Sequence, residues 1–435
     1  MHWPVHSWVV HVVHTSRPSG SRTDTCHRSR HVHLARPDRT PAVSSVAVVA
    51  NTDLLCTPSE GNEVKSTSLR RAAAPGALAL SAVLAVSACS ASNEEDDDAA
   101  NTASVEGGDE LSGTLNGGGA SSQEAAMEAW RAGFQEATNP DVTVNYDPVG
   151  SGGGREQFIS GGFTFAGSDS YLEGEELAGA EERCGGTVVE IPSYISPIAV
   201  IYNLPDVDTL NLAPEVVAGI FAGEITAWDD PAIAEDNPDA ELPDLEINPV
   251  HRSDESGTTG NFTSYMDATA SDVWTFGETE VWPDVGGEAA AQTSGVVSAV
   301  EGGEGSVGYA DASQAGELGT AAIGVGEEFV EYSPEAAAAV VDASEQVEGR
   351  GDTGLVYDLA RDTTEEGVYP IVLVSYHIAC LEYEEELDAE LTRAFLTYVI
   401  SPAGQDAAAE NAGSAPISDT IQEQAQAAVD QITAG

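Results

Sequence analysis

The chain has 435 residues, enough for two or three ordinary domains with a sizeable core. Hydrophobic residues make up 41% of it, so the chain as a whole is not of the disordered class. No apolar run reaches the roughly 18–20 residues of a membrane span, which excludes a polytopic membrane protein. The formal net charge of −57 argues against a nucleic-acid partner, because phosphate backbones attract clustered lysine and arginine.

The first 88 residues differ in composition from the rest. They hold nine of the sixteen basic residues and five acidic ones. From residue 89 onward there are seven arginines, no lysine and 68 acidic residues, a net charge of −61.

Residues 1–63 are rich in histidine and arginine and show no periodicity. One interpretation is a metal-binding tract formed by His2, His6, His11 and His14. We favour the other, in which translation starts near Val64 and residues 1–63 are a mis-annotated or unstructured extension.

Residues 64–88 have the organisation of a signal peptide. A positive region with Lys65 and two arginines precedes the apolar stretch 72–86, which is too short to span a membrane by itself. The segment ends in Val-Ser-Ala-Cys at residues 86–89, which resembles the lipobox of bacterial lipoproteins. In that family the cysteine is acylated and becomes the first mature residue. The resemblance implies a palmitate-type lipid anchor at Cys89, on the extracytoplasmic face of the cell membrane. A buried structural cysteine is the alternative.

The exported part begins with an acidic segment, residues 89–110, which we expect to be a flexible tether. Beyond it the chain has two more cysteines, Cys184 and Cys380. Two thiols in an exported chain indicate one disulfide, with two independent buried thiols as the alternative. No CxxC pair or histidine–cysteine cluster offers a metal site, so we expect neither a metal nor a cofactor.

From residue 111 the pattern alternates between strands and helices. Met127, Trp130 and Phe134 recur at helical spacing and predict a core-facing stripe. Helices are predicted over 123–138, 151–158, 214–221, 258–268, 293–300, 384–400 and 417–432, and strands over 142–146, 163–166, 188–191, 198–202, 247–250, 306–309 and 369–378. This alternation indicates an α/β fold with mostly parallel strands. About 320 residues exceed one comfortable core, so two lobes are expected.

Three loops rich in glycine, serine and threonine each follow a predicted strand and precede a predicted helix: residues 117–122, 150–154 and 256–260. Glycine lets a backbone approach a ligand closely, and a helix N-terminus offers free N–H groups to an anion. One such loop alone is typical of ordinary helix capping, but three with Arg252 nearby indicate an anion site. The chain from residue 89 has no lysine for a P-loop and no Gly-x-Ser-x-Gly elbow.

Residues 251–263, His-Arg-Ser-Asp-Glu-Ser-Gly-Thr-Thr-Gly-Asn-Phe-Thr, closely resemble the signature of the phosphate-binding proteins that supply phosphate ABC transporters. The resemblance continues in family order through residues 115–121, 150–153, 165–169, 225–233, 305–309 and 369–371. It implies an α/β, two-lobed fold like that of periplasmic binding proteins, with a hinge and a ligand cleft between the lobes. We expect residues 111–196 plus 370–435 to form lobe 1 and residues 197–369 to form lobe 2. The implied function is non-catalytic: high-affinity binding of inorganic phosphate by a monomer at the cell surface and delivery to the permease.

The resemblance also implies a ligand set. The positions that match the family's phosphate ligands are Ser121, Ser122 (through its backbone N–H), Ser151, Asp169, Arg252, Ser256, Gly257 (through its backbone N–H) and Thr258. Asp254 matches a carboxylate that pairs with the arginine. This sequence departs from the family at two positions: Ser122 stands where a bulkier residue is usual, and Gly152 where a second serine is common.

Two other functions stay open at this point. A secreted phosphoryl-transfer enzyme with Ser151 or Ser256 as nucleophile lacks a plausible base, since His251 and His377 are the only histidines after residue 33. A binding protein for another oxyanion, such as sulfate, would use the same loops.

Overall fold

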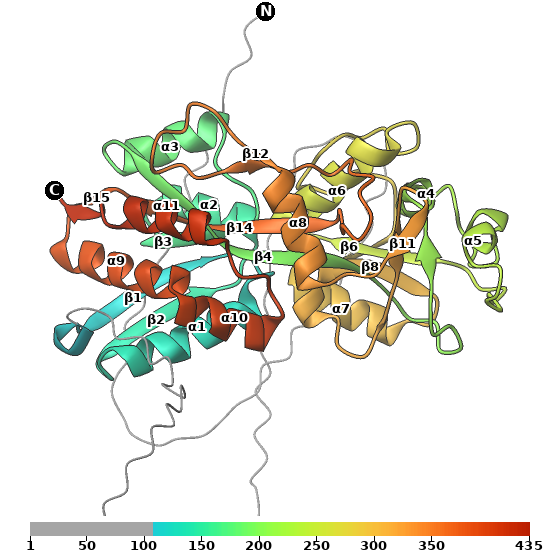
Figure 1. Cartoon of the computed structure of the whole chain (residues 1–435), viewed down its shortest axis with the longest axis horizontal. Helices are drawn as coiled ribbons and strands as arrows, with labels where there is room; N and C mark the ends of the chain where they lie inside the picture. Colours follow the sequence, from blue (N-terminus) through green and yellow to red (C-terminus); the bar gives the residue numbers. More distant parts are fainter. Residues whose placement is uncertain (1–107) are drawn as a thin grey trace, which may run out of the picture. The chain divides into compact units, whose positions relative to one another are not determined.

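The computed structural model describes residues 108–435, and Figure 1 shows how their helices and strands are arranged. The extension 1–63, the predicted signal peptide 64–88, Cys89 and all but the last residues of the predicted tether 89–110 lie outside the described residues. Within 108–435, no helix combines the length and the apolar character needed to cross a membrane.

A nine-stranded sheet with the strand order β2-β1-β3-β14-β4-β8-β6-β7, and with β9 beside β4, forms the core of the described chain. Its first half contains β1 (Gly113–Gly119), β2 (Val142–Asp147), β3 (Phe165–Ser168), β14 (Val372–Cys380) and the beginning of β4 (Val188–Tyr202). We call this half, with its helices, the first lobe. Those helices are α1 (Glu124–Ala137), α2 (Ser151–Ile159), α3 (Gly174–Arg183), α9 (Glu386–Ile400), α10 (Pro402–Ala412) and α11 (Asp419–Val429).

The second half of the sheet is formed by the end of β4 together with four further strands. These are β6 (Asn248–Arg252), β7 (Glu288–Ala290), β8 (Ser306–Asp311) and β9 (Gly319–Thr320). A small sheet of β5 (Asn211–Leu212), β10 (Ala322–Val325) and β11 (Glu328–Val330) lies in the same lobe. The helices of this second lobe are α4 (Pro214–Phe221), α5 (Pro231–Asp236), α6 (Gly257–Ala270), α7 (Gln292–Gly302) and α8 (Pro334–Ala343). Short elements complete the chain: η1 (Gly108–Glu110), η2 (Ala312–Gln314), β12 (Glu345–Gln346), β13 (Tyr357–Asp358), β15 (Glu382–Tyr383) and β16 (Thr433–Ala434).

The predicted α/β class and two-lobed fold are confirmed, but the expectation of mostly parallel strands is wrong for the centre of the sheet. The outer pairs β1–β2, β1–β3, β6–β7 and β6–β8 are parallel. In contrast, β14 is antiparallel to β3 and β4, and β4 is antiparallel to β8. The chain leaves the first lobe along β4 and returns along β14 (Figure 1), and therefore these two neighbours run in opposite directions.

The strands predicted over 188–191 and 198–202 are one continuous strand, β4. The sequence reads as two strands because Pro192 and Pro197 interrupt it and proline cannot donate to a strand ladder. In the structure the register of β4 against β14 shifts between Ser375 and Tyr376, with Pro192 opposite Tyr376. A bulge of this kind accommodates the proline and re-aims the side chains beside it.

Four helices were not predicted from the sequence: α3, α5, α8 and α10. Their apolar stripes are weak, as in α3, where Ala180 is the one buried residue that the helix carries, or in the alanine-rich α8. The predicted stripe of α1 is confirmed, since Met127, Trp130 and Phe134 are all buried. The Trp130 indole N–H donates to the carbonyl of Gly404, 2.8 Å away, and so joins α1 to α10.

Part of the range expected to form lobe 2 also contacts the first lobe. Between α8 and β14 the chain runs beside β4, where the Glu190 N–H donates to the carbonyl of Thr353 (2.8 Å) and the Leu355 N–H donates to the carbonyl of Glu190 (2.9 Å). Arg350 forms an ion pair with the buried Glu190. The return connection is thus attached to the first lobe before β14 begins.

Cys184 and Cys380 form a disulfide with Cα atoms 5.2 Å apart and 196 residues apart in sequence. Cys184 follows the last residue of α3, and Cys380 ends β14. The bond therefore joins two segments of the first lobe.

Candidate functional site

The three loops singled out in the sequence meet around Asp169, the residue that follows β3. Ser121 lies between β1 and α1, Ser151 is the first residue of α2, and Ser256 caps α6. All three serines are buried, as is Asp169 itself. Two loops come from the first lobe and one from the second, so that the N-termini of α1, α2 and α6 approach one place from both lobes.

The Asp169 carboxylate accepts hydrogen bonds from three hydroxyl groups. Ser122 and Ser375 donate to Oδ1, each at 2.6 Å, and Thr258 donates to Oδ2 at 3.0 Å. Burial raises the pKa of Asp169, and these three hydrogen bonds and the charge of Arg252 oppose the rise. A carboxylate offers about four lone-pair positions. One acceptor position on Oδ2 is therefore left for a further donor.

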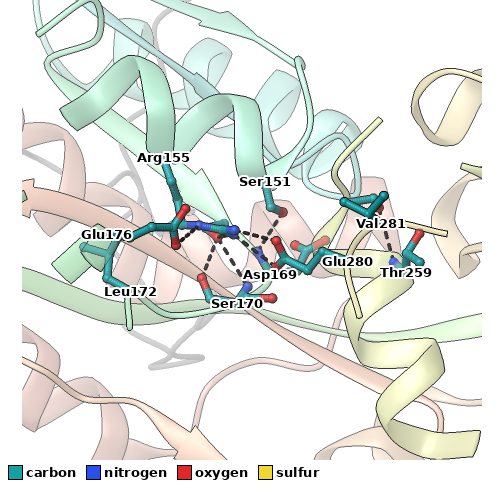
Figure 2. Close-up of polar contacts among 12 residues, drawn as sticks. Ser151, Arg155, Asp169, Ser170, Leu172, Glu176, Thr259, Glu280 and Val281 are labelled. Atoms are coloured by element: carbon teal, nitrogen blue, oxygen red, sulfur yellow. Dashed lines mark hydrogen bonds and ion pairs between the residues drawn. The ribbon is translucent and has the colours of Figure 1, made fainter. Parts of the chain in front are cut away.

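Three serine oxygens accept a main-chain N–H group. The amide of Asp169 donates to Ser151 Oγ at 3.1 Å (Figure 2), that of Thr259 to Ser256 Oγ at 3.2 Å, and that of Thr293 to Ser121 Oγ at 3.2 Å. An amide can only donate, so each serine oxygen acts as an acceptor in these contacts, and the hydrogens of Ser151 and Ser256 are left for another partner. The site is therefore a set of hydroxyl donors, which suits an anion.

Arg252 ends β6 and supplies the positive charge of the site. Its guanidinium is buried and forms an ion pair with Asp254, with Nε donating to Oδ1 at 2.9 Å. Asp254 also accepts the N–H of Gln292 at 3.0 Å. Burial raises the pKa of Asp254, but the hydrogen bond and charge of Arg252 outweigh it, and the pKa is lowered overall. The carboxylate fixes the orientation of the guanidinium and reduces its net charge.

The two lobes are in direct contact at this place. A Cβ atom on Gly257, at the start of α6, would lie 2.6 Å from Ser151 Oγ and 2.7 Å from Asp169 Cβ, so only glycine fits there. A Cβ on Gly152 would meet the side chain of Glu255 at 2.5 Å, and the Gly152 N–H donates to the Glu255 carbonyl at 3.3 Å. The departure from the family pattern at Gly152 thus leaves room for Glu255 of the other lobe.

The structure also gives a role to the side chain of Ser122, for which the resemblance implied only a backbone contact. Its hydroxyl donates to Asp169. The other residues of the predicted ligand set lie where the loops converge. Among them, the Thr258 hydroxyl donates a hydrogen bond to Asp169 of the other lobe.

Two groups of residues around Asp169 and Ser121 were not predicted from the sequence. Ser375 donates to Asp169 and accepts from the Gln123 side chain at 2.6 Å. At the N-terminus of α7, Thr293 lies 3.0 Å from Ser121 Oγ through its hydroxyl oxygen, and Gln292 adopts a φ of +63°, a left-handed conformation unusual for a residue with a side chain. A single serine within the apolar run of β14 was the signal available for Ser375. The three-residue strand β7 before α7 left no comparable signal.

The chemistry of this arrangement is that of anion binding. Helix N-termini, serine hydroxyls and one arginine offer donors, and Asp169 offers one acceptor. Among residues 108–435, no group of three or more histidine, cysteine, aspartate or glutamate side chains is placed to hold a metal ion.

Comparisons with known proteins agree on one family. A family model described as a PBP superfamily domain matches residues 104–403. Phosphate-binding protein PstS 3 of Mycobacterium leprae is 35% identical over 371 residues, which cover 83% of this chain and 98% of the relative. Phosphate-binding protein PstS 2 of Mycobacterium tuberculosis is 34% identical over 332 residues, covering 73% of this chain and 87% of the relative.

Solved structures are similar in fold. A high-affinity periplasmic phosphate-binding protein, PfluDING, solved with bound phosphate, has a TM-score of 0.59 at 21% identity, over 72% of this chain and 93% of that one. A phosphate-binding protein from Stenotrophomonas maltophilia has a TM-score of 0.57 at 19% identity, also over 72% and 93%.

Proposed function

This chain belongs to the PBP superfamily and, within it, to the family of PstS phosphate-binding proteins, and on this premise we propose that it binds inorganic phosphate between its lobes and delivers it to the permease of a phosphate ABC transporter. The observation that carries the proposal is the convergence of three serine-bearing loops on the buried Asp169 beside Arg252: Ser122, Ser151 and Thr258, one from each loop, contact Asp169 directly.

The proposed ligands are those implied by the sequence resemblance. They are Ser121, the N–H of Ser122, Ser151, Asp169, Arg252, Ser256, the N–H of Gly257 and Thr258, with Asp254 holding Arg252. Phosphate at neutral pH is a mixture of mono- and dianion. The single positive charge of Arg252 cannot neutralise the phosphate dianion, and Asp254 offsets part of that positive charge. The helix N-termini and the hydroxyls therefore share the remaining charge through charge-assisted hydrogen bonds.

Phosphate also carries at least one proton, and this fits Asp169. The remaining acceptor position on its carboxylate can take a hydrogen from the ligand, which an anion without a proton cannot supply. This supports phosphate over sulfate as the ligand.

Isothermal titration calorimetry of the purified protein with phosphate, sulfate and molybdate tests the function. We expect tight binding of phosphate and weak or no binding of sulfate. Arg252→Ala should weaken every oxyanion, whereas Arg131→Ala, which removes an exposed arginine on α1, should leave all three affinities unchanged. Tighter binding of sulfate or molybdate than of phosphate would contradict the assignment.

We propose a binding protein and not an enzyme, in keeping with its PstS relatives, which are named for binding. Both histidines of the exported part have other partners. His251 donates through Nδ1 to the carbonyl of Arg252 at 2.9 Å and stacks on Trp282. His377 shares a hydrogen bond with Ser193, and burial lowers the pKa of the His377 imidazole to about 3. Turnover of a chromogenic phosphate ester above the buffer rate, lost in Ser151→Ala or Ser256→Ala, would favour the enzyme.

We further propose that the protein is a monomer held by a lipid at Cys89 on the extracytoplasmic face of the cell membrane. The lipid anchor is inferred from the order of positive charge, apolar stretch and cysteine in residues 64–89. Cys89→Ser should release the protein from the membrane fraction, and Ser87→Ala, two residues earlier in the chain, should not. Retention of the Cys89→Ser protein in membranes would show that another segment holds it there.

A further inference from the structure

Arg155 lies on α2, one turn after Ser151, and its buried guanidinium connects the two lobes (Figure 2). Within the first lobe, Nε donates to Glu176 at 2.9 Å and Nη1 donates to Ser168 at 3.0 Å. Toward the second lobe, Nη1 donates to Glu280 Oε1 at 3.2 Å, and Nη2 forms an ion pair with the other oxygen of the same carboxylate. The guanidinium is thus shared between one carboxylate of each lobe.

Glu280 is attached to the loop that holds the proposed ligands of the second lobe. Its carbonyl accepts the N–H of Ser256, the N-cap of α6, at 3.1 Å. Gly260 leaves room for its side chain, since a Cβ there would lie 3.0 Å from Glu280 Cγ. The ion pair therefore links the helix that begins at Ser151 to the residue that caps α6.

The two carboxylates differ in what happens when the lobes separate. Glu176, on α3, stays with Arg155, so the guanidinium keeps an ionic partner and the Ser168 hydroxyl. Glu280, on the second lobe, would move away from Arg155 and become hydrated. Burial lowers the pKa of Arg155, but Glu280 and, to a smaller extent, Glu176 raise it above its usual value. Opening the contact with Glu280 thus leaves the Arg155 guanidinium paired with Glu176, so no buried charge is left without a partner. Forming the contact stabilises the closed state.

We propose that Arg155 and Glu280 are determinants of ligand affinity that do not touch the ligand: their ion pair holds the lobes closed and slows release of the bound anion. The proposal rests on the proposed function, because release is measured for phosphate. A group that stabilises only the closed state acts mainly on the dissociation rate, since the ligand leaves after opening.

Stopped-flow measurement of phosphate release from the full exported chain tests this proposal. Glu280→Gln should raise the dissociation rate about tenfold and change the association rate by less than about twofold. Glu176→Gln is the matched control: it removes a carboxylate from the same guanidinium but leaves the contact between lobes, and should change the dissociation rate by less than about threefold. In Arg155→Met, adding Glu280→Gln should produce no further increase. Thermal unfolding of the ligand-free variants checks that each is folded.

Equal dissociation rates for wild type and Glu280→Gln, or a larger effect of Glu176→Gln, would overturn the role of the ion pair while leaving phosphate binding intact. Failure of the wild type to bind phosphate would instead overturn the proposed function. In that case small-angle scattering of the ligand-free protein decides the matter: Glu280→Gln should have a larger radius of gyration than Glu176→Gln, and equal radii would contradict the proposal.

Discussion

Asp169 accepts hydrogen bonds from Ser122, Thr258 and Ser375, which come from three separate segments of the chain. These hydroxyls fill most of its acceptor positions and hold the carboxylate in one orientation. Only an anion that carries a hydrogen can then approach Oδ2 without bringing two bare oxygens together. An unpaired buried charge costs several kcal/mol, and rejection of a competitor by such a cost is an effective source of specificity.

Asp169→Asn should narrow the difference between phosphate and sulfate affinities, chiefly by admitting sulfate, because the amide supplies a donor at the same place. A few kcal/mol corresponds to a factor of hundreds in affinity, so we expect the phosphate-to-sulfate ratio to fall by at least about tenfold in calorimetry. The control is Asp141→Asn, which changes an exposed aspartate before β2 and should leave the ratio unchanged. An unchanged ratio in Asp169→Asn would show that Asp169 does not select between the two anions.

Sulfate binding should also strengthen as the pH falls. The pKa of Asp169 is raised by burial, so the carboxyl takes up a proton at a higher pH than an exposed aspartate. Once protonated it can donate to a sulfate oxygen, and sulfate itself does not titrate in this range. Calorimetry with sulfate from pH 8 down to pH 4.5 should show increasing affinity in the wild type and a flat profile in Asp169→Asn. A parallel increase in both proteins would assign the effect to another group.

Elements were predictable from the sequence where their pattern is strong. The stripe of α1 has a clear helical periodicity, β14 is a continuous apolar run, and the structure contains both elements. Helices α8 and α10 were missed because alanine-rich sequences give little contrast between faces. The continuity of β4 through Pro192 depends on a bulge against β14, which is a tertiary feature and leaves no local signal.

The same contrast applies to the site. The loops before α1, α2 and α6 have a local signature of glycine, serine and threonine, and the structure brings these loops together. Ser375, Thr293 and Glu280 lie in segments without such a signature, and only the folded arrangement places them beside Asp169, Ser121 and Arg155. Their roles come from contacts 125 to 206 residues apart in sequence.

Removing the disulfide should lower stability without changing phosphate affinity. For a loop of nearly 200 residues, the chain-entropy model gives about 4–5 kcal/mol at most. Cys380 lies five residues beyond Ser375 on β14, outside the contacts of Asp169. Urea unfolding of Cys184→Ser/Cys380→Ser should show a lower midpoint, and wild type unfolded under reducing conditions serves as the matched comparison. A midpoint equal to that of the oxidised wild type would show that the bond does not stabilise the fold.

At the scale of the whole molecule, the distribution of charge is uneven. Three of the seven arginines after residue 89, Arg155, Arg252 and Arg361, are buried, whereas the surface carries most of the 68 acidic residues. An incoming anion therefore meets repulsion at long range and attraction only near the site. Salt screens the repulsion beyond roughly 8 Å at physiological ionic strength.

The association rate of phosphate should therefore rise with ionic strength, opposite to the behaviour of an electrostatically steered pair. We expect an increase of several-fold between about 10 mM and about 150 mM sodium chloride, measured by stopped flow. Substituting an uncharged osmolyte for the salt is the control and should leave the rate unchanged. A rate that falls with salt would show that the local field of Arg252 extends beyond the acidic surface.

The disulfide has a mechanical consequence. Everything from β4 to β13, including the whole second lobe, lies between Cys184 and Cys380 along the chain, while both cysteines belong to the first lobe. Tension applied at residues 108 and 435 passes through the sulfur–sulfur bond and bypasses the 196-residue loop. At roughly 3.3–3.6 Å per extended residue, about 650–700 Å of contour length is shielded from stretching. Tension at these two residues can therefore unfold the parts of the first lobe outside the loop, while β14 and the second lobe bear no load.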